Sequence, residues 1–263
     1  MSFDKTLVIV GPTASGKTGV SIKIAQEIER RAKESPDGNF CGFKGAEIVS
    51  ADSRAIYQEM DIGTAKPTSV EQGLAKHWGI DLVKPGERFT VADWKAYAEV
   101  KIAEIRARGN LPIVAGGTGL YIDALVYDYH FTEQNKCSQS DRQEICSNFL
   151  LIGIDAAPEV LRKRITERAN TFFTQELYEE TEKLAQKYAW DTQAMKSNIY
   201  QFAWSYLEGD ISLERAKELF IYDDWHLAKR QLTWFRRNQN IIWLPLAEIR
   251  GYVLKCIQDE QRN

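Results

Sequence analysis

Short apolar runs alternate with stretches of helical periodicity along most of the chain. The apolar runs predict buried strands at residues 6–10 and 46–53 and at the start of 111–122 and 149–169. Helices are predicted at 16–34 and 89–110, the second with Thr90 as its N-cap and an end near Gly109. Strands that alternate with helices in this way favour a parallel sheet flanked by helices, so the expected fold class is α/β.

The second half of the chain has a different pattern. Residues 159–240 are almost entirely helical in character, and residues 240–246 (NIIWLPL) predict a last strand. Residues 35–45, rich in glycine and polar side chains, are typical of an exposed loop. A chain of 263 residues is long enough to bury a large core. We therefore expect one domain over residues 1–263, with 159–240 as its mainly helical C-terminal region.

A glycine-rich turn joins the first predicted strand to the first helix. Residues 11–18 (GPTASGKT) match the pattern G-x-x-x-x-G-K-[ST], in which backbone N–H groups cradle phosphate oxygens. Lys17 supplies positive charge, and the Thr18 hydroxyl is of the type that ligates Mg²⁺. Because strand, turn and helix follow one another as this motif requires, we interpret the segment as a P-loop. The motif requires a polyphosphate anion but does not specify ATP or GTP.

Two further candidate sites follow other predicted strands. In parallel sheets, ligands bind beside the carboxyl ends of the strands, where the P-loop, residues 49–57 and residues 114–122 all lie. Asp52 is a candidate general base or magnesium ligand, or else it caps a helix. Thr118 either faces the same anion or caps the turn into the next helix. The residues alone leave both choices open, although the neighbouring P-loop favours a functional role for Asp52.

Composition indicates where the protein works. Hydrophobic residues make up 44% of the chain and charged residues 27%, as in soluble globular proteins. No apolar run approaches the roughly 20 residues that span a bilayer. The four cysteines are scattered without a CxxC pair, which argues against a zinc site or a disulfide framework. We therefore expect a cytoplasmic protein without membrane association. Because the net charge is −3, nucleic-acid binding would require a local concentration of positive charge.

Residues 226–237 (HLAKRQLTWFRR) provide such a concentration. Successive side chains of a helix are rotated by about 100°, which places six polar side chains on one face within an arc of roughly 120°. They are His226, Lys229, Arg230, Thr233, Arg236 and Arg237. The remainder carries mainly apolar side chains, including Trp234 and Phe235, and is predicted to pack on the core. A cationic face of this kind either meets nucleic-acid phosphates or is solvated surface, and the helix alone does not decide between them.

Five segments of the chain are informative when they are taken in order: GPTASGKT (11–18), EIVSADSRAIYQEMDIGTAKPT (47–68), LPIVAGGTGLYIDAL (111–125), WSYLEG (204–209) and AKRQLTWFRR (228–237). Together they resemble the tRNA dimethylallyltransferase family, whose members transfer an isopentenyl group to the adenosine beside the anticodon. MDIGTAKPT (60–68) and AKRQLTWFRR discriminate best, because ordinary P-loop kinases carry neither. The resemblance implies a P-loop NTPase-like fold in which the P-loop holds the diphosphate of dimethylallyl diphosphate and no ATP is consumed.

The resemblance also implies roles for individual residues. The exocyclic amine of adenine attacks the allylic carbon as diphosphate leaves, and Asp52 is the carboxylate that assists near the amine proton. Lys17 and Thr118 are expected to assist catalysis, and Thr18 to bind Mg²⁺. The implied diphosphate-binding residues are Gly11, Thr13, Ala14, Ser15, Gly16, Lys17 and Thr18. The implied tRNA-binding residues are Asp52, Ser53, Arg54, Ala55, Thr118, Lys229, Arg230, Arg236 and Arg237. We expect a monomer with tRNA and dimethylallyl diphosphate as substrates.

Three departures from the family pattern stand out. Many members have Gln where this chain has Ala55, so one base contact is expected to be missing. The family pattern Gly-Tyr-Arg-Gln is replaced by residues 199–202 (IYQF), and Gln201 stands in place of an arginine that resembles a diphosphate or substrate ligand. Its loss predicts binding weaker by about 1.5–3 kcal/mol. Only residues 132–148 span the place of the family's helical insertion, which suggests a minimal member with reduced contact with tRNA.

Three other functions stay open on the sequence. An adenylate isopentenyltransferase uses the same chemistry on a free nucleotide; the short insertion favours it, and the basic helix argues against it. A small-molecule P-loop kinase would leave MDIGTAKPT unexplained. A tRNA-binding protein without catalysis is suggested by Gln201. A tRNA-modifying prenyltransferase accounts for most of the motifs.

Overall fold

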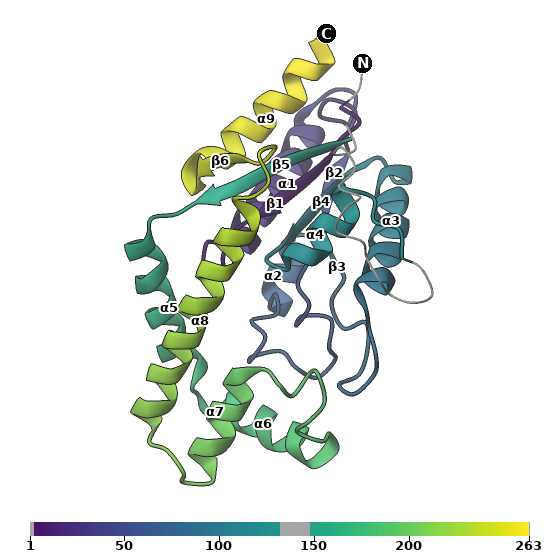
Figure 1. Ribbon diagram of the computed structural model, residues 1–263. Helices are drawn as coiled ribbons and strands as arrows, with labels where there is room; N and C mark the ends of the chain where they lie inside the picture. The colour runs from purple at the N-terminus through teal and green to yellow at the C-terminus, as the bar shows by residue number, and fades with distance from the viewer. Residues whose placement is uncertain (1–2, 132–147, 263) are drawn as a thin grey trace.

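The computed structural model describes residues 3–131 and 148–262, and within them a six-stranded sheet forms the centre of the molecule (Figure 1). The strand order is β3-β2-β4-β1-β5-β6, and all neighbouring strands are parallel. The strands are β1 (Thr6–Val10), β2 (Gly45–Ser50), β3 (His77–Trp78), β4 (Asn110–Gly116), β5 (Phe149–Asp155) and β6 (Ile242–Pro245). The predicted parallel α/β fold is therefore confirmed.

Helices cover both faces of this sheet. One face packs against α1 (Lys17–Glu34) and α9 (Leu246–Arg262), and the other against α3 (Val91–Ala107) and α4 (Gly119–Val126). Successive residues of a strand point to opposite faces, so Ile9 of β1 packs on the first side and Val10 on the second. Because both faces are buried, each central strand must be apolar along most of its length, which is why the apolar runs predicted the strands correctly.

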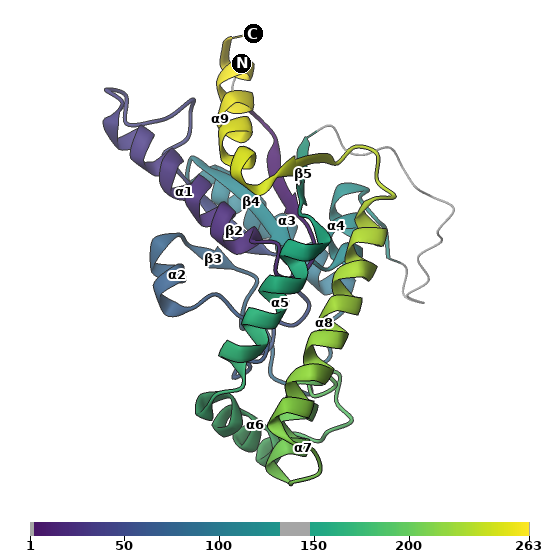
Figure 2. The same ribbon diagram turned by 90° about the vertical axis from the view of Figure 1, so that its left-hand side faces the viewer.

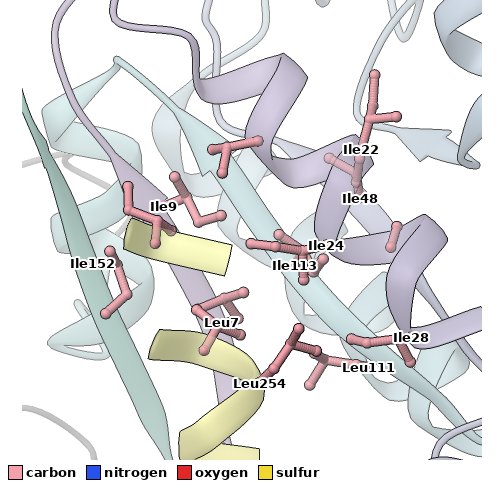
Figure 3. Packing of buried hydrophobic residues seen from close by; sticks show 14 of the residues in the cluster. Leu7, Ile9, Ile22, Ile24, Ile28, Ile48, Leu111, Ile113, Ile152 and Leu254 are labelled. Atoms are coloured by element: carbon pink, nitrogen blue, oxygen red, sulfur yellow. The ribbon is translucent and has the colours of Figure 1, made fainter. Parts of the chain in front are cut away.

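Figure 3 shows the interface that holds α1 on the sheet. Leu7 and Ile9 of β1 lie among Ile24 and Ile28 of α1 and Leu254 of α9. All five side chains are buried. This packing fixes the first turn of α1, and with it the P-loop that precedes the helix, relative to the strand ends.

The mainly helical region extends away from the sheet. It comprises α5 (Pro158–Phe172), α6 (Gln175–Lys187), α7 (Asn198–Leu207) and α8 (Leu213–Phe235). Near its N-terminus α8 packs with α6 and α7 through Phe220, in a cluster that also includes Ile56 and Met60. At its other end α8 returns to the sheet, where Phe235 is buried beside α3 and α4 (Figures 1 and 2). The helical character predicted for 159–240 is confirmed, and the single-domain description stays a prediction.

Some local predictions are confirmed and some elements were not foreseen. Thr90 caps α3, because its hydroxyl accepts a hydrogen bond from Asp93 N, and the Asp93 carboxylate in turn accepts one from Thr90 N. The sequence analysis missed α2 (Ser69–Leu74), β3 and α9. No residue of α2 is buried and β3 has two residues, so neither shows an apolar period.

The segment 132–148 lies outside the described residues except for Asn148. No helix among the described residues is long and apolar enough to cross a membrane.

A buried carboxylate on β2 accepts hydrogen bonds from side chains of β3, β4 and the end of α3. Glu47 of β2 accepts hydrogen bonds from Arg108 Nε and Nη2 (2.9 Å each), Asn110 Nδ2 (2.8 Å) and Trp78 Nε1 (2.7 Å). Burial alone would raise the pKa of Glu47, but these hydrogen bonds outweigh burial and lower the pKa to about 2.

Glu47→Gln is expected to lower the free energy of unfolding at neutral pH by about 2–4 kcal/mol, because the partly exposed Arg108 loses its charged partner. The folded-state pKa lies below the ordinary value of 4.5, so this stability is present above that value and is lost as the pH falls toward 2. Urea unfolding at about pH 7 and about pH 3.5 should show a smaller difference between variant and wild type at the lower pH. An equal difference at both pH values would contradict the assignment. Glu34→Gln is the control, because Glu34 forms an exposed pair with Arg30 and should change stability by less than about 1 kcal/mol.

Candidate active site

The strand order brings three loops together at the carboxyl edge of the sheet. Since β4 lies between β1 and β2, the P-loop after β1 is beside the turn after β4, which is beside the turn after β2. Backbone hydrogen bonds join the last two turns: Ala51 N donates to Ala115 O (2.8 Å), and Thr118 N donates to Ala51 O (3.1 Å). The expectation that the three predicted strand ends meet is therefore confirmed.

The P-loop has the features of an anion site. Gly16 precedes α1 with a φ of 99°, in the left-handed region that favours glycine. The first N–H groups of α1 have no acceptor within the helix and carry its positive dipole end. The Ser15 hydroxyl is buried and has no hydrogen-bond partner among the described residues. A bound phosphate oxygen would satisfy this hydroxyl, as buried polar groups require.

Lys17 bends back over the loop. Its Nζ donates to Gly11 O (3.0 Å) and Pro12 O (2.8 Å). Burial lowers the pKa of Lys17 to about 8; the nearby carboxylates of Asp52 and Asp224 oppose this change, and the guanidinium of Arg168 adds to it. Arg168 and Asp224 both form hydrogen bonds with the Thr13 hydroxyl, so these two charged groups also lie beside the P-loop.

The two oxygens of Asp52 have different surroundings. Oδ1 accepts hydrogen bonds from Arg54 N (2.8 Å) and Ala55 N (3.4 Å), so the carboxylate caps the turn that follows β2. Oδ2 accepts no hydrogen bond from any residue that the structure describes. Residues 53–56 form a turn and no helix, so the helix cap that the sequence left open is wrong. The role of Asp52 as proton acceptor stays a prediction.

Thr118 links the turn after β2 to the turn after β4. Its Oγ1 accepts from Ser53 N (3.0 Å) and donates to Ser53 Oγ (3.2 Å), and it makes no capping hydrogen bond with α4. The Arg54 side chain contacts the helical region, where its Nη1 donates a hydrogen bond to Gln193 O (2.7 Å). Ala55 is 3% exposed, so its side chain presents almost no surface to a substrate. The tRNA contacts assigned to Ser53, Arg54 and Ala55 stay predictions.

Helix α8 contributes a residue that the sequence analysis missed. Gln231 Oε1 accepts from Thr13 N (2.7 Å), and Gln231 Nε2 donates to Gly117 O (3.0 Å). One side-chain amide therefore joins the P-loop to the turn after β4. The N–H of Thr13 is occupied by this contact, so the diphosphate role assigned to Thr13 would have to use other atoms. The signal was present, because Gln231 lies within AKRQLTWFRR.

Three more missed residues lie on α5 and α8. Arg164 Nη1 donates to Ser15 O (2.9 Å) and to Ala14 O (3.3 Å). Arg168 Nη1 donates to Thr13 Oγ1 (2.7 Å) and lies 3.5 Å from Asp224 Oδ2. Burial raises the pKa of Asp224, and Arg168 opposes that change. The one available signal was the spacing of Arg164 and Arg168, which are four residues apart and so share one face of a helix that follows a sheet strand.

The sequence matches a known protein family. Residues 55–148 and 131–238 match the model of the IPP transferase family. The chain belongs to this family. The tRNA dimethylallyltransferase of Acetivibrio thermocellus is 36% identical over 94% of this chain and 93% of that protein. The tRNA dimethylallyltransferase of Lactococcus lactis subsp. cremoris is 35% identical over 92% of each. The resemblance inferred from the motifs is confirmed.

Solved structures agree with the family assignment. The tRNA isopentenylpyrophosphate transferase of Bacillus halodurans has a TM-score of 0.78 and 27% identity, over 99% of this chain and 100% of that one. The tRNA delta(2)-isopentenylpyrophosphate transferase of Staphylococcus epidermidis has a TM-score of 0.80 and 28% identity, over 97% of this chain and 99% of that one. The P-loop NTPase-like architecture predicted from the sequence is thus confirmed.

The predicted basic face is divided, because α8 ends at Phe235 and Arg236 and Arg237 lie in the turn that follows it. Lys229, Arg230 and Arg237 are exposed and form no ion pair with any described residue. Arg236 differs, because its Nη2 lies 2.7 Å from Asp155 Oδ1 and its guanidinium covers the Trp243 ring at 4.1 Å. Three of the four predicted cations are therefore available to phosphates without breaking an ion pair.

Trp234 corrects one prediction about the same helix. Phe235 is buried as expected, but Trp234 is 36% exposed and does not belong to the core. Its Nε1 donates to Asp123 Oδ2 (2.9 Å), and its ring covers Gly119, where a Cβ would lie 2.3 Å away. The hydrogen bond and the glycine together hold the indole at the surface, over the start of α4.

The segment MDIGTAKPT supports the site from outside. Lys66 is buried, donates to Tyr57 O (2.9 Å) and pairs with Asp61 and Asp81 at 2.5 Å. The Glu180 carboxylate of α6 accepts from the backbone N–H groups of residues 61–63. These contacts join the turn after β2 to the helical region. Gln201, on α7, is exposed, and the weaker substrate binding expected from it stays a prediction.

The donors at the P-loop fit a magnesium ion that is bound together with a diphosphate. Among the described residues no group of three or more His, Cys, Asp or Glu side chains could hold a metal ion. Mg²⁺ retains several waters and often takes only one or two protein ligands beside substrate phosphates. The Thr18 hydroxyl, in the first turn of α1, is compatible with that role.

Proposed function

We propose that the protein transfers the dimethylallyl group of dimethylallyl diphosphate to the exocyclic amine of the adenosine next to the anticodon in tRNA. The new bond joins the amine nitrogen to the allylic carbon, the bond from that carbon to the diphosphate oxygen breaks, and the amine loses a proton. The proposal depends above all on one observation: the P-loop, Asp52 and Thr118 meet at one edge of the sheet. The names of the relatives favour tRNA over a free nucleotide as acceptor.

Each group in the site has a task in this reaction. The P-loop amides, Ser15 and Lys17 hold the diphosphate and stabilise the charge that it gains on leaving. Asp52 accepts the amine proton through Oδ2, while Oδ1 keeps the turn in place. Thr118 fixes Ser53 and therefore the position of that turn. Mg²⁺, held by Thr18 and the diphosphate, would neutralise charge on the leaving group.

The tRNA would lie along the exposed face of α8. Gln231 reaches the P-loop from this helix, Arg230 is exposed on it, and Arg237 is exposed in the turn just after it. A phosphate backbone bound at Arg230 and Arg237 would bring the anticodon loop to the site, where the target adenosine must leave its stack at a cost of a few kcal/mol. We propose that a monomer suffices, because the P-loop, Asp52 and Thr118 come from one chain.

The test is mass spectrometry of nucleosides after incubation of the protein with Mg²⁺, dimethylallyl diphosphate and unmodified tRNA. A parallel reaction offers AMP and ATP as acceptors. Prenylated adenosine in the tRNA digest is the expected product. Prenylated free nucleotide alone would overturn tRNA as the substrate, and the lack of any product in either reaction would overturn prenyl transfer.

Arg230→Ala combined with Arg237→Ala is expected to weaken tRNA binding and to reduce the slope of log K against log salt by about 2, because two phosphate contacts are lost. Filter binding across a salt series measures the slope. Arg215→Ala is the matched control, since Arg215 lies on the same helix but pairs with Glu218. A slope equal to that of the control would mean that the face is only solvated.

A further inference from the structure

A polar cluster between α5 and α8 borders the P-loop. Arg168 of α5 and Asp224 of α8 lie 3.5 Å apart, and both contact the Thr13 hydroxyl, which accepts from Arg168 Nη1 (2.7 Å) and donates to Asp224 Oδ2 (3.3 Å). The Arg168 side chain is 28% exposed and that of Asp224 is 11% exposed. Figure 2 shows the two helices side by side.

Arg168 has donors to spare. A guanidinium carries five N–H groups, yet Nε and Nη2 of Arg168 donate to none of the described residues. A phosphate oxygen in the P-loop would lie within reach of these groups, because Nη1 already touches a P-loop hydroxyl. Arg164 differs, since it donates to the carbonyls of Ala14 and Ser15 and thereby holds the loop backbone.

Asp224 needs a separate explanation. A carboxylate beside an anion site repels the ligand, and this one is mostly buried, so its presence requires a compensating role. Its contacts supply one, because Asp224 holds both Arg168 and the hydroxyl to which Arg168 donates. The carboxylate therefore keeps the guanidinium at the mouth of the loop.

We propose that Arg168 is a ligand of the diphosphate and that Asp224 is its positioning residue. The inference rests on the proposed function in taking diphosphate as the anion. Arginine suits this role, because its planar donors bind phosphate oxygens in pairs and its charge adds to that of Lys17. The leaving diphosphate then has cations on two sides, from α1 and from α5.

The experiment measures binding of inorganic diphosphate in the presence of Mg²⁺ by calorimetry, together with KM for dimethylallyl diphosphate and for tRNA. Arg168→Gln should raise the Kd for diphosphate and the KM for dimethylallyl diphosphate by about 10- to 100-fold, with KM for tRNA unchanged. Arg168→Lys should recover part of the affinity, because it restores the charge. Arg162→Gln is the control on the same helix, since Arg162 is exposed and stacks on Trp225.

The outcomes separate the two roles. Wild-type affinity in Arg168→Gln would show that Arg168 is not a ligand of the diphosphate and would overturn the proposal. Asp224→Asn should weaken diphosphate binding less than Arg168→Gln, and the double variant should be no weaker than Arg168→Gln alone. Tighter binding in Asp224→Asn would overturn the positioning role. Diphosphate binding is read without prenyl transfer, so failure of the proposed reaction would show as wild-type protein that binds diphosphate but makes no product.

Discussion

Asp52→Asn is expected to lower turnover by about 100-fold or more, because the variant loses the group that takes the amine proton. Asparagine is isosteric, and its Oδ1 can still accept from Arg54 N and Ala55 N. The turn after β2 should therefore keep its shape, and tRNA affinity should be unchanged. Single-turnover rates with saturating substrates measure the chemical step, and filter binding measures the affinity.

Two further variants make this result interpretable. Asp52→Ala removes the cap as well as the base, so it should also lower stability by about 1 kcal/mol, visible as a lower melting temperature. Asp93→Asn changes another capping carboxylate, on α3, and should leave turnover unchanged. Turnover near that of wild type in Asp52→Asn would remove Asp52 from the mechanism.

Lys17→Met is expected to reduce kcat/KM for dimethylallyl diphosphate by about 100- to 1000-fold, the range for loss of one preorganised donor at a developing anion. Methionine retains most of the length of the lysine side chain but carries no charge and cannot donate to Gly11 O or Pro12 O. Binding of tRNA through α8 should be unaffected. Steady-state kinetics with each substrate varied in turn separates the two effects.

The control for this variant is Lys23→Met on the same helix. Lys23 is exposed and six residues further along α1, so its substitution should leave both kinetic constants unchanged. If Lys17→Met kept the wild-type kcat/KM, the P-loop would not be the diphosphate site. If it lost affinity for tRNA as well, the loop and the basic face of α8 would be coupled through Gln231, the residue that joins them.

Local features of the sequence determined a large part of this protein. Buried strands need apolar residues on both faces, so β1, β2, β4 and β5 were visible as apolar runs, and Thr90 marked the start of α3. The P-loop could be recognised because its residues are contiguous and follow a strand and precede a helix, as the motif requires. Asp52 and Thr118 were found because parallel strands all end at one edge of the sheet.

Only the tertiary structure decided what surrounds the P-loop. Gln231 meets Thr13 across 218 positions of sequence, and Arg168 meets the same residue across 155. No local period or composition encodes such contacts, because they depend on how α8 packs along α5 and returns to the sheet. The same packing sets Trp234 at the surface and pairs Arg236 with Asp155. A helical wheel sorts side chains by direction, but which directions meet protein, and which meet a substrate, is fixed by the neighbours that the fold supplies.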